Sequence, residues 1–202
     1  REKELTAYHE AGHALVASVL PYAAPVHKIS IISRGRAAGY VLKLPIEEKK
    51  LQSKKEFLDD ITVTLAGYAV EKNIFGDLTT GPSNDLQVAT ALARDMVTKY
   101  GMSEKMGPIA LEGAGGKLIY GQGVSEDGYS EVVSAAIDAE VSRMVGESLK
   151  RAEKIIKDHR KVLDAIAGRL VETETIERKE FEELISAHGI VPKRKKDIEH
   201  QK

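Results

Sequence analysis

Two histidines and one glutamate near the start of the chain have the spacing of a metal-dependent hydrolase. The segment from His9 to His13 reads H-E-x-x-H, with Glu10 in second place. Because an α-helix completes a turn in about 3.6 residues, His9 and His13 would project from one helical face and could offer two imidazole nitrogens to one zinc ion. Glu10 would lie beside the metal, where a general base can take a proton from a water that zinc activates. The motif therefore predicts a zinc hydrolase.

The residues around the motif favour the helix that this chemistry requires. No proline interrupts residues 3–20, and alanine, leucine and valine flank the motif. Gly12 within such a helix costs about 1 kcal/mol relative to alanine and is usually found where another backbone or a ligand comes close. The alternative is a surface pair of histidines with a solvated glutamate between them, which fits the apolar flanks less well.

A catalytic zinc ion usually has three protein ligands and one water, so the two histidines need a partner. The chain has no cysteine, which leaves histidine, aspartate and glutamate as the strong ligands. Val16 and Val19 stand where the longer motif of the metzincins has glycine and histidine, which excludes that class. The candidates for the third ligand are His27, Glu71 and Asp85.

Each acidic candidate also has a purely structural interpretation. Glu71 follows a helical stretch, like the glutamate that completes thermolysin-like sites, but it could equally be a solvated acid on a helix. Asp85 would lie in the first turn of a helix, where the helix dipole stabilises a carboxylate with or without a metal. The residue types and their spacing leave this choice open.

The composition is that of a globular chain. Of its 202 residues, 42% are hydrophobic and 30% are charged, and the net charge is -1. One medium domain or two small ones are expected, without the charge that would attract nucleic acid. The longest apolar stretch, residues 14–25, is too short to span a bilayer, so the chain as given is expected to be soluble. The glycine-rich segments 113–117 and 121–123 lack the spacing of a nucleotide-binding loop.

Periodicity in hydrophobic residues predicts the elements that position the site. Residues 26–33 and 39–44 alternate as strands do, with a basic turn at 34–36 between them. Residues 53–75 and 86–100 have apolar side chains at helical spacing, and a glycine follows each segment.

The remainder of the chain is predicted to be a loop followed by helices. Residues 102–128 have loop character, with short strands at 108–111 and 117–120. Three further helices are predicted at 130–157, 161–172 and 177–188, with starts near Ser130 and Thr175-Ile176-Glu177.

These elements suggest one domain at residues 1–190. Its active-site half would cover about 1–100, and its helical half about 129–190. Residues 191–202 form a basic tail, for which a disordered end is the simpler interpretation than a nucleic-acid patch.

Several motifs together resemble the peptidase domain of the FtsH family, the membrane-bound ATP-dependent AAA zinc metalloproteases. The likeness runs from Arg1 to about Ile190 in the family's order. The matching segments are 7–14, 26–31, 75–81, 83–86 with 89–90, and 100–108.

The resemblance implies a mainly α (α+β) fold, a zincin-type helical domain with a small β-sheet and a C-terminal helical bundle. It also implies that Asp85 completes the zinc site with His9 and His13, and that Glu71 supports the ligands without binding the metal. Tyr68, Lys72 and Pro82 depart from the family's pattern around the site, although they leave the ligands intact.

The family's activity would be hydrolysis of peptide bonds in unfolded or membrane proteins. The resemblance implies one Zn2+ per chain, an AAA ATPase domain that uses ATP and lies outside this chain, a homohexamer, and the cytoplasmic face of a membrane in the full-length protein. No nucleic-acid partner is expected. The strand Gly39-Tyr40-Val41-Leu42 could receive an extended substrate at its edge. Two alternatives are a free-standing thermolysin-like peptidase that uses Glu71, and a non-catalytic, zinc-stabilised oligomerisation module.

Overall fold

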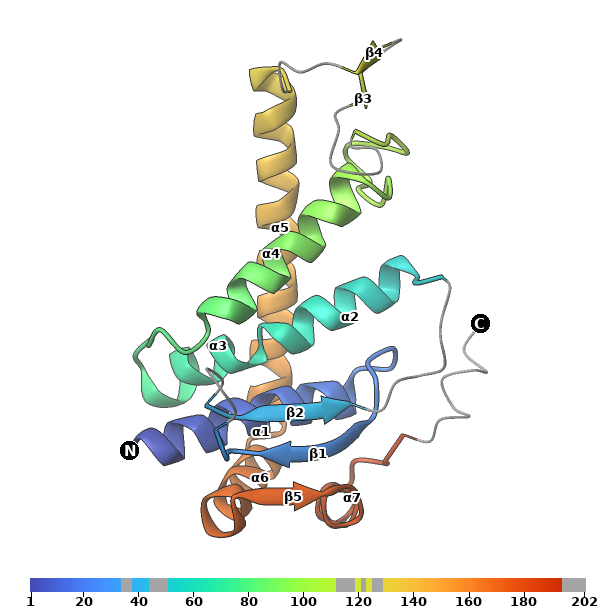
Figure 1. Cartoon of the computed structure of the whole chain (residues 1–202). Coiled ribbons are helices and arrows are strands. Elements are labelled where there is room, and N and C mark those ends of the chain that lie inside the picture. Colours follow the sequence, from blue (N-terminus) through green and yellow to red (C-terminus); the bar gives the residue numbers. More distant parts are fainter. Residues whose placement is uncertain (34–37, 44–50, 112–118, 121–122, 125–128, 194–202) are drawn as a thin grey trace.

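The helix that carries the H-E-x-x-H motif, α1 (Glu2–Val19), packs against helices from both halves of the chain in the computed structural model (Figure 1). The structure describes residues 1–33, 38–43, 51–111, 119–120, 123–124 and 129–193. Ala7, Ala11 and Ala14 are fully buried on α1. Their small side chains let neighbouring helices approach closely, while Leu15 fills the space between them.

The segment predicted as one helix at 53–75 is helical throughout but divided. It consists of α2 (Lys54–Thr64), α3 (Ala66–Val70) and the π-helical turn η1 (Glu71–Phe75). The hydroxyl of Ser53 accepts a hydrogen bond from the Glu56 amide, and the Glu56 carboxylate accepts one from the Ser53 amide, which caps the start. Gly76, with φ of 67°, ends the segment in the left-handed conformation that glycine favours.

A three-stranded antiparallel sheet lies beside α1, in the order β2-β1-β5. β1 (Val26–Ser30) and β2 (Tyr40–Lys43) confirm the two predicted strands, although the turn at 34–36 lies outside the described residues. β5 (Thr175–Glu177) was predicted only as the start of a helix. These residues form a strand rather than a helical turn because they pair with β1, and this pairing buries Ile176 opposite Ile29.

The long helix α5 (Glu131–Asp158) runs from the top of the molecule down behind α1 in Figure 1. It packs against α2, α3 and α4 (Ser83–Thr98), around a second core that includes Met96, Ile137 and Met144. α6 (Arg160–Thr173) returns along α1, and α7 (Arg178–Ala187) lies next to it. The predicted helices at 130–157, 161–172 and 177–188 are confirmed within a residue or two.

The strand predicted at 108–111 is wrong. Pro108 has no amide hydrogen to donate, and the amides of Ile109 and Leu111 donate to Gly107 and Thr98 in the loop and at the end of α4. The strand predicted at 117–120 is represented by β3 (Ile119–Tyr120), which pairs with β4 (Gly123–Val124). Lys117 and Leu118 lie outside the described residues.

Lys193 lies near the start of the segment predicted as a tail. Its ammonium group donates to the backbone carbonyls of Ala17, Leu20 and Ala23, at and just beyond the end of α1. Residues 194–202 lie outside the described residues.

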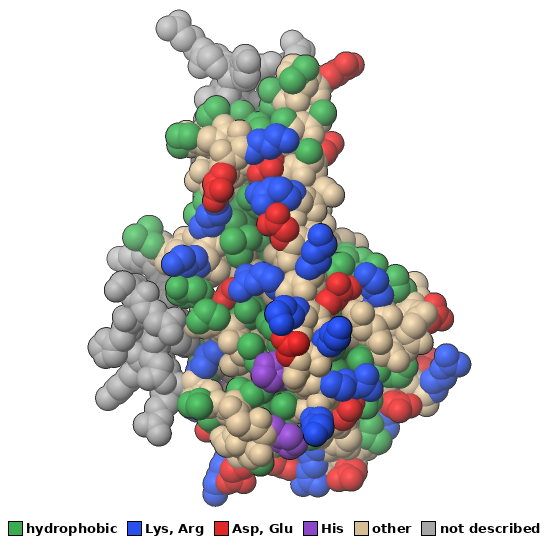
Figure 2. All heavy atoms as spheres, turned by 180° about the vertical axis from the view of Figure 1, so that it is seen from behind, with side chains coloured by type: hydrophobic (Ala, Val, Ile, Leu, Met, Phe, Trp, Pro, Cys, Tyr) green, Lys and Arg blue, Asp and Glu red, His purple; other side chains and the backbone are tan. Residues whose placement is uncertain are grey.

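On the face shown in Figure 2, acidic and basic side chains are interspersed, in keeping with a net charge of -1. Over the described part of the chain, no helix combines the length and apolar character needed to cross a bilayer.

Candidate metal centre

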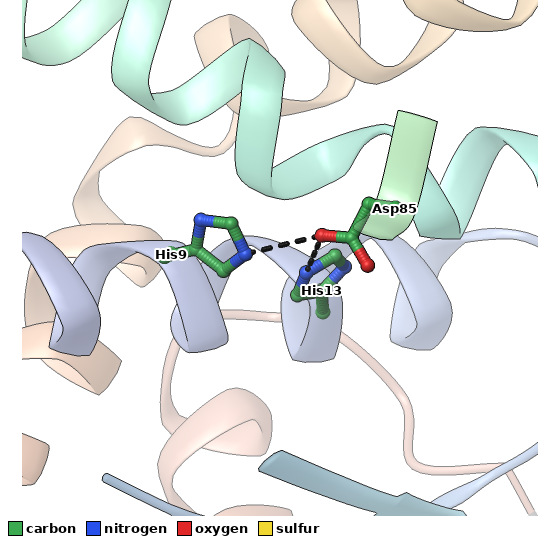
Figure 3. Close-up of side chains that lie close together, drawn as sticks. All are labelled: His9, His13 and Asp85. Carbon is green, nitrogen blue, oxygen red and sulfur yellow. Dashed lines mark hydrogen bonds and ion pairs between the residues drawn. The ribbon is translucent and has the colours of Figure 1, made fainter. Parts of the chain in front are cut away.

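His9, His13 and Asp85 lie together where α1 meets the start of α4 (Figure 3). Oδ2 of Asp85 lies 3.2 Å from Nε2 of His9 and 3.3 Å from Nε2 of His13. One ligand atom from each of the three residues lies within 4.8 Å of the others. Within the described part of the chain, this is the one cluster of histidine and acidic side chains suited to a metal ion. Two imidazole nitrogens and one carboxylate oxygen are the ligand types of a catalytic zinc site.

The other ring nitrogen of each histidine has its own partner. Nδ1 of His13 lies 2.7 Å from the backbone carbonyl oxygen of Val63, which can only accept a hydrogen bond. Nδ1 of His13 therefore carries a proton, and its Nε2, which lies beside Asp85, is the nitrogen that could bind a metal ion. Nδ1 of His9 lies 3.3 Å from Oε1 of Glu71. Partners of this kind hold metal-binding histidines in the required orientation.

Glu71 lies on the far side of His9 from Asp85. Its side chain is fully buried, and its Oε2 accepts hydrogen bonds from the amide and the hydroxyl of Thr79, at 2.8 and 2.9 Å. The structure therefore does not bring Glu71 into the cluster that faces Nε2 of His9. His27, the third candidate, lies on β1, and its buried Nδ1 has no hydrogen-bond partner among the residues that the structure describes. It is also outside the cluster.

Two glycines let α1 and α3 approach each other at the site. A Cβ atom on Gly67 would lie 2.2 Å from Cε1 and 2.3 Å from Nε2 of His9. One on Gly12 would lie 2.6 Å from Cγ2 of Val70 and 3.2 Å from the Ala66 carbonyl oxygen. The expected close approach at Gly12 is confirmed, whereas the one at Gly67 was not predicted. The available signal was a glycine in the middle of a predicted helix.

Glu10 lies beside the cluster, between α1 and the start of β2. It is 7% exposed, and a Cβ atom on Gly39 would lie 2.8 Å from its Oε1. Burial raises the pKa of Glu10, although the neighbouring His13 and His9 oppose this shift. The pKa of Asp85 is lowered: burial alone would raise it, but hydrogen bonds from His13 and His9 outweigh that effect.

A cleft with a volume of about 1470 Å³ opens over the cluster. Its walls come from α1, β2, the end of α2, the loop before α4 and the start of α4. Of the predicted substrate strand, Gly39, Tyr40 and Val41 line the cleft. Leu42 does not line it and is 47% exposed, whereas Lys43, one residue further on, does. A cleft of this size can hold an extended peptide across the cluster.

Comparisons with known proteins agree with this geometry. The model of peptidase family M41 matches residues 1–184. The ATP-dependent zinc metalloprotease FtsH of Endomicrobium trichonymphae is 44% identical over 193 residues, which are 95% of this chain and 31% of that protein. The FtsH of Thermotoga maritima is 46% identical over 188 residues, which are 92% of this chain and 31% of that protein. The chain thus spans under a third of the length of these relatives. Since both the family match and the similarity to FtsH run over nearly all of its residues, the chain belongs to peptidase family M41.

Proposed function

We propose that the chain is the proteolytic domain of an ATP-dependent, membrane-anchored zinc metalloprotease, and that it hydrolyses peptide bonds of unfolded or threaded proteins. The observation that carries this proposal is the convergence of His9 and His13 on Asp85, with Glu10 beside them. The relatives are named ATP-dependent zinc metalloproteases, and the donor set fits that metal.

His9, His13 and Asp85 would hold the metal. When bound, zinc supplies Lewis-acid polarisation of the scissile carbonyl and lowers the pKa of a water to about 7. The Nδ1 partners of the two histidines, Val63 and Glu71, keep both Nε2 atoms directed at the same point.

Glu10 would act as the general base. Its carboxylate takes a proton from the attacking water and later donates that proton to the leaving amine. Burial raises the pKa of Glu10, which helps the group to hold the proton between these two steps. Because α1 fixes Glu10 next to His9 and His13, the proton moves over a short distance.

β2 would bind the substrate. It is one of the two outer strands of the sheet that the described residues form, and Gly39, Tyr40 and Val41 line the cleft beside Glu10. An extended peptide could add to this edge through main-chain hydrogen bonds, with Leu42 facing outward. Main-chain pairing is indifferent to sequence, which suits an enzyme that digests unfolded chains. The AAA ATPase domain of the full-length protein would deliver them, in a homohexamer at the cytoplasmic face of the membrane.

The substitution Glu10→Gln tests the proposal. The amide cannot accept the water's proton, while the three ligands remain, so we expect zinc content close to one ion per chain and a loss of casein or peptide hydrolysis of about 100-fold or more. Metal analysis and hydrolysis rates on the same preparation measure both quantities. Substantial turnover by a zinc-loaded Glu10→Gln protein would remove Glu10 as the base.

The same measurements separate the alternatives. Stoichiometric zinc in a wild-type protein that hydrolyses no peptide would favour the oligomerisation module. Hydrolysis of stable folded proteins without nucleotide would favour the free-standing peptidase.

A further inference from the structure

Charge is unevenly distributed over the cleft. Its lining near the cluster includes the carboxylates of Glu10, Glu71, Asp77 and Asp85. The described lining has two basic side chains, Arg1 at the start of the chain and Lys43 at the end of β2. Val63 and Thr64, from the end of α2, also line the cleft.

Lys43 is partly buried and has no ion-pair or hydrogen-bond partner for its ammonium group among the described residues. Burial lowers its pKa, and the carboxylates of Asp60 and Asp85 only partly oppose that shift. A lysine that has lost much of its hydration gains from a carboxylate that comes within hydrogen-bond distance.

Among the described residues, neither nearby carboxylate forms an ion pair with Lys43, and each has another partner. Asp60 accepts a hydrogen bond of 2.6 Å from Nε2 of Gln52. Asp85 is held between the Nε2 atoms of His9 and His13. Lys43 lines the cleft, from which a partner for its ammonium group could come.

We propose that Lys43 is a specificity-determining residue that binds an acidic side chain of the peptide substrate. This inference rests on the proposed peptidase function. Val41 and Lys43 share one face of β2, since side chains alternate along a strand, and Gly39 lies directly before that strand. Gly39 lies against Glu10, whereas Lys43 is four residues further on, at about 3.3 Å per residue. The acidic side chain would thus lie a few residues from the scissile bond, clear of the carboxylates around the metal.

A different role for Lys43 would be to act on the metal centre through the charge of Asp85. Such an effect would change the hydrolysis of every peptide by the same factor. A subsite changes only the hydrolysis of peptides that carry the acid. The ratio of kcat/KM for matched peptides therefore separates the two roles.

The experiment uses unstructured peptides in pairs, with a single Glu or Gln placed in turn at each position within about four residues of the scissile bond. For the zinc-loaded wild-type protein, we expect a position at which Glu is preferred about tenfold, equivalent to about 1.4 kcal/mol. The ratio of kcat/KM for the Glu peptide to that for the Gln peptide should fall to near one in Lys43→Met and below one in Lys43→Glu. Asp60→Asn removes an opposing charge and should raise the ratio.

Lys28→Met is the matched control. Lys28 lies on the neighbouring strand β1, and its ammonium group pairs with Glu177 at 2.6 Å. It does not line the cleft. We expect this variant to keep the wild-type preference for the Glu peptide over the Gln peptide.

Peptide affinity provides a second readout that does not depend on turnover. Binding of the same pairs to the Glu10→Gln protein, measured by fluorescence anisotropy, should show the same preference and lose it when Lys43→Met is added. A preference that survives Lys43→Met, or a ratio near one at every position in the wild type, overturns the inference. If the wild type hydrolyses no peptide at all, the proposed function fails, and the anisotropy comparison still decides whether Lys43 selects acidic ligands.

Discussion

Glu71 divides its two carboxylate oxygens between a histidine and a loop. Oε1 faces Nδ1 of His9 at 3.3 Å, and Oε2 accepts two hydrogen bonds from Thr79. Thr79 lies in the loop that leads to Asp85. One buried side chain therefore positions His9 directly and the Asp85 side of the centre through the loop. We infer that Glu71 supports the site without binding the metal.

Removing Asp85 and altering Glu71 should have different effects on zinc. We expect Asp85→Ala to lose most of its zinc, because one of three protein ligands is gone. Glu71→Gln should retain zinc with an affinity about 10- to 100-fold lower, as is typical when a group that supports a ligand is changed. Zinc content after dialysis against graded concentrations of a chelator measures the difference.

Glu153→Gln is the control for that series, since Glu153 lies on α5 and pairs with Lys72. Full zinc retention in Asp85→Ala together with complete loss in Glu71→Gln would overturn the ligand assignment.

Gly67 is required by the position of the His9 ring. A Cβ atom there would lie 2.2 Å from the ring, so Gly67→Ala must displace either His9 or the backbone of α3. We expect a folded protein with zinc affinity lowered by at least about tenfold, as for other changes in groups that support metal ligands. Isothermal titration with zinc, alongside circular dichroism, measures both properties.

Gly168→Ala is the matched substitution, because a Cβ atom at this position in α6 would meet nothing within 4 Å. It should keep the wild-type zinc affinity and stabilise the fold by about 0.5–1 kcal/mol. Equal zinc affinity in the two variants would show that the His9 ring tolerates a methyl group.

The sequence alone predicts some residues of this site and leaves the others undetermined. His9, Glu10 and His13 are found by spacing because one helix positions all three. Asp85 comes from another helix, so the residues alone could not distinguish it from Glu71 without the family resemblance. Both acids lie close to His9, on its two different nitrogens. Only the fold assigns each acid to a nitrogen.

The elements that could be predicted from the sequence are those whose ends are marked by residues close by in the chain. The helix at 53–75 has a capping serine at its start and a glycine at its end, and both ends were located correctly. The division at Leu65 was not predicted, because it accompanies the close approach of α3 to α1. β5 was missed because three residues form a strand only when a distant partner pairs with them.

Lys193 stabilises the end of α1. Its ammonium group donates to the carbonyls of Ala17, Leu20 and Ala23, where the helix dipole is negative. We expect Lys193→Met to lower the free energy of unfolding by about 1–2 kcal/mol, since the lost interaction is partly buried. Urea unfolding measures the change.

Lys161→Met, at an exposed position of α6, is the comparison and should change the free energy of unfolding by less than about 0.5 kcal/mol. If the two substitutions lower the free energy of unfolding equally, the contacts of Lys193 contribute no stability to α1.

At the scale of the whole molecule, we expect the cleft to admit an extended chain rather than a folded one. The peptide bond must reach His9, Glu10 and His13, whose side chains are largely buried. We therefore expect this domain, without nucleotide, to digest a permanently unfolded protein and to leave the stable folded form of the same protein intact. Degradation rates for the two forms measure this.

Assembly is a separate prediction at the same scale. We expect the domain to form a sixfold ring through its helical half, and the mass in solution across a dilution series tests this. A strictly monomeric protein that digests the folded substrate as fast as the unfolded one would contradict the dependence on an ATPase.

The pairing of β1 with β5 has a consequence for biosynthesis. Lys28 and Glu177 face each other across that pairing although 149 residues separate them. At about 5–20 residues per second, a ribosome needs on the order of 10 to 30 s to make the intervening chain. Throughout that interval α1 lacks α6, which covers its buried alanines, and the sheet lacks its third strand. A nascent chain would therefore carry the complete H-E-x-x-H motif long before the sheet and the helix beside α1 are complete, and we expect peptidase activity only after synthesis has passed β5.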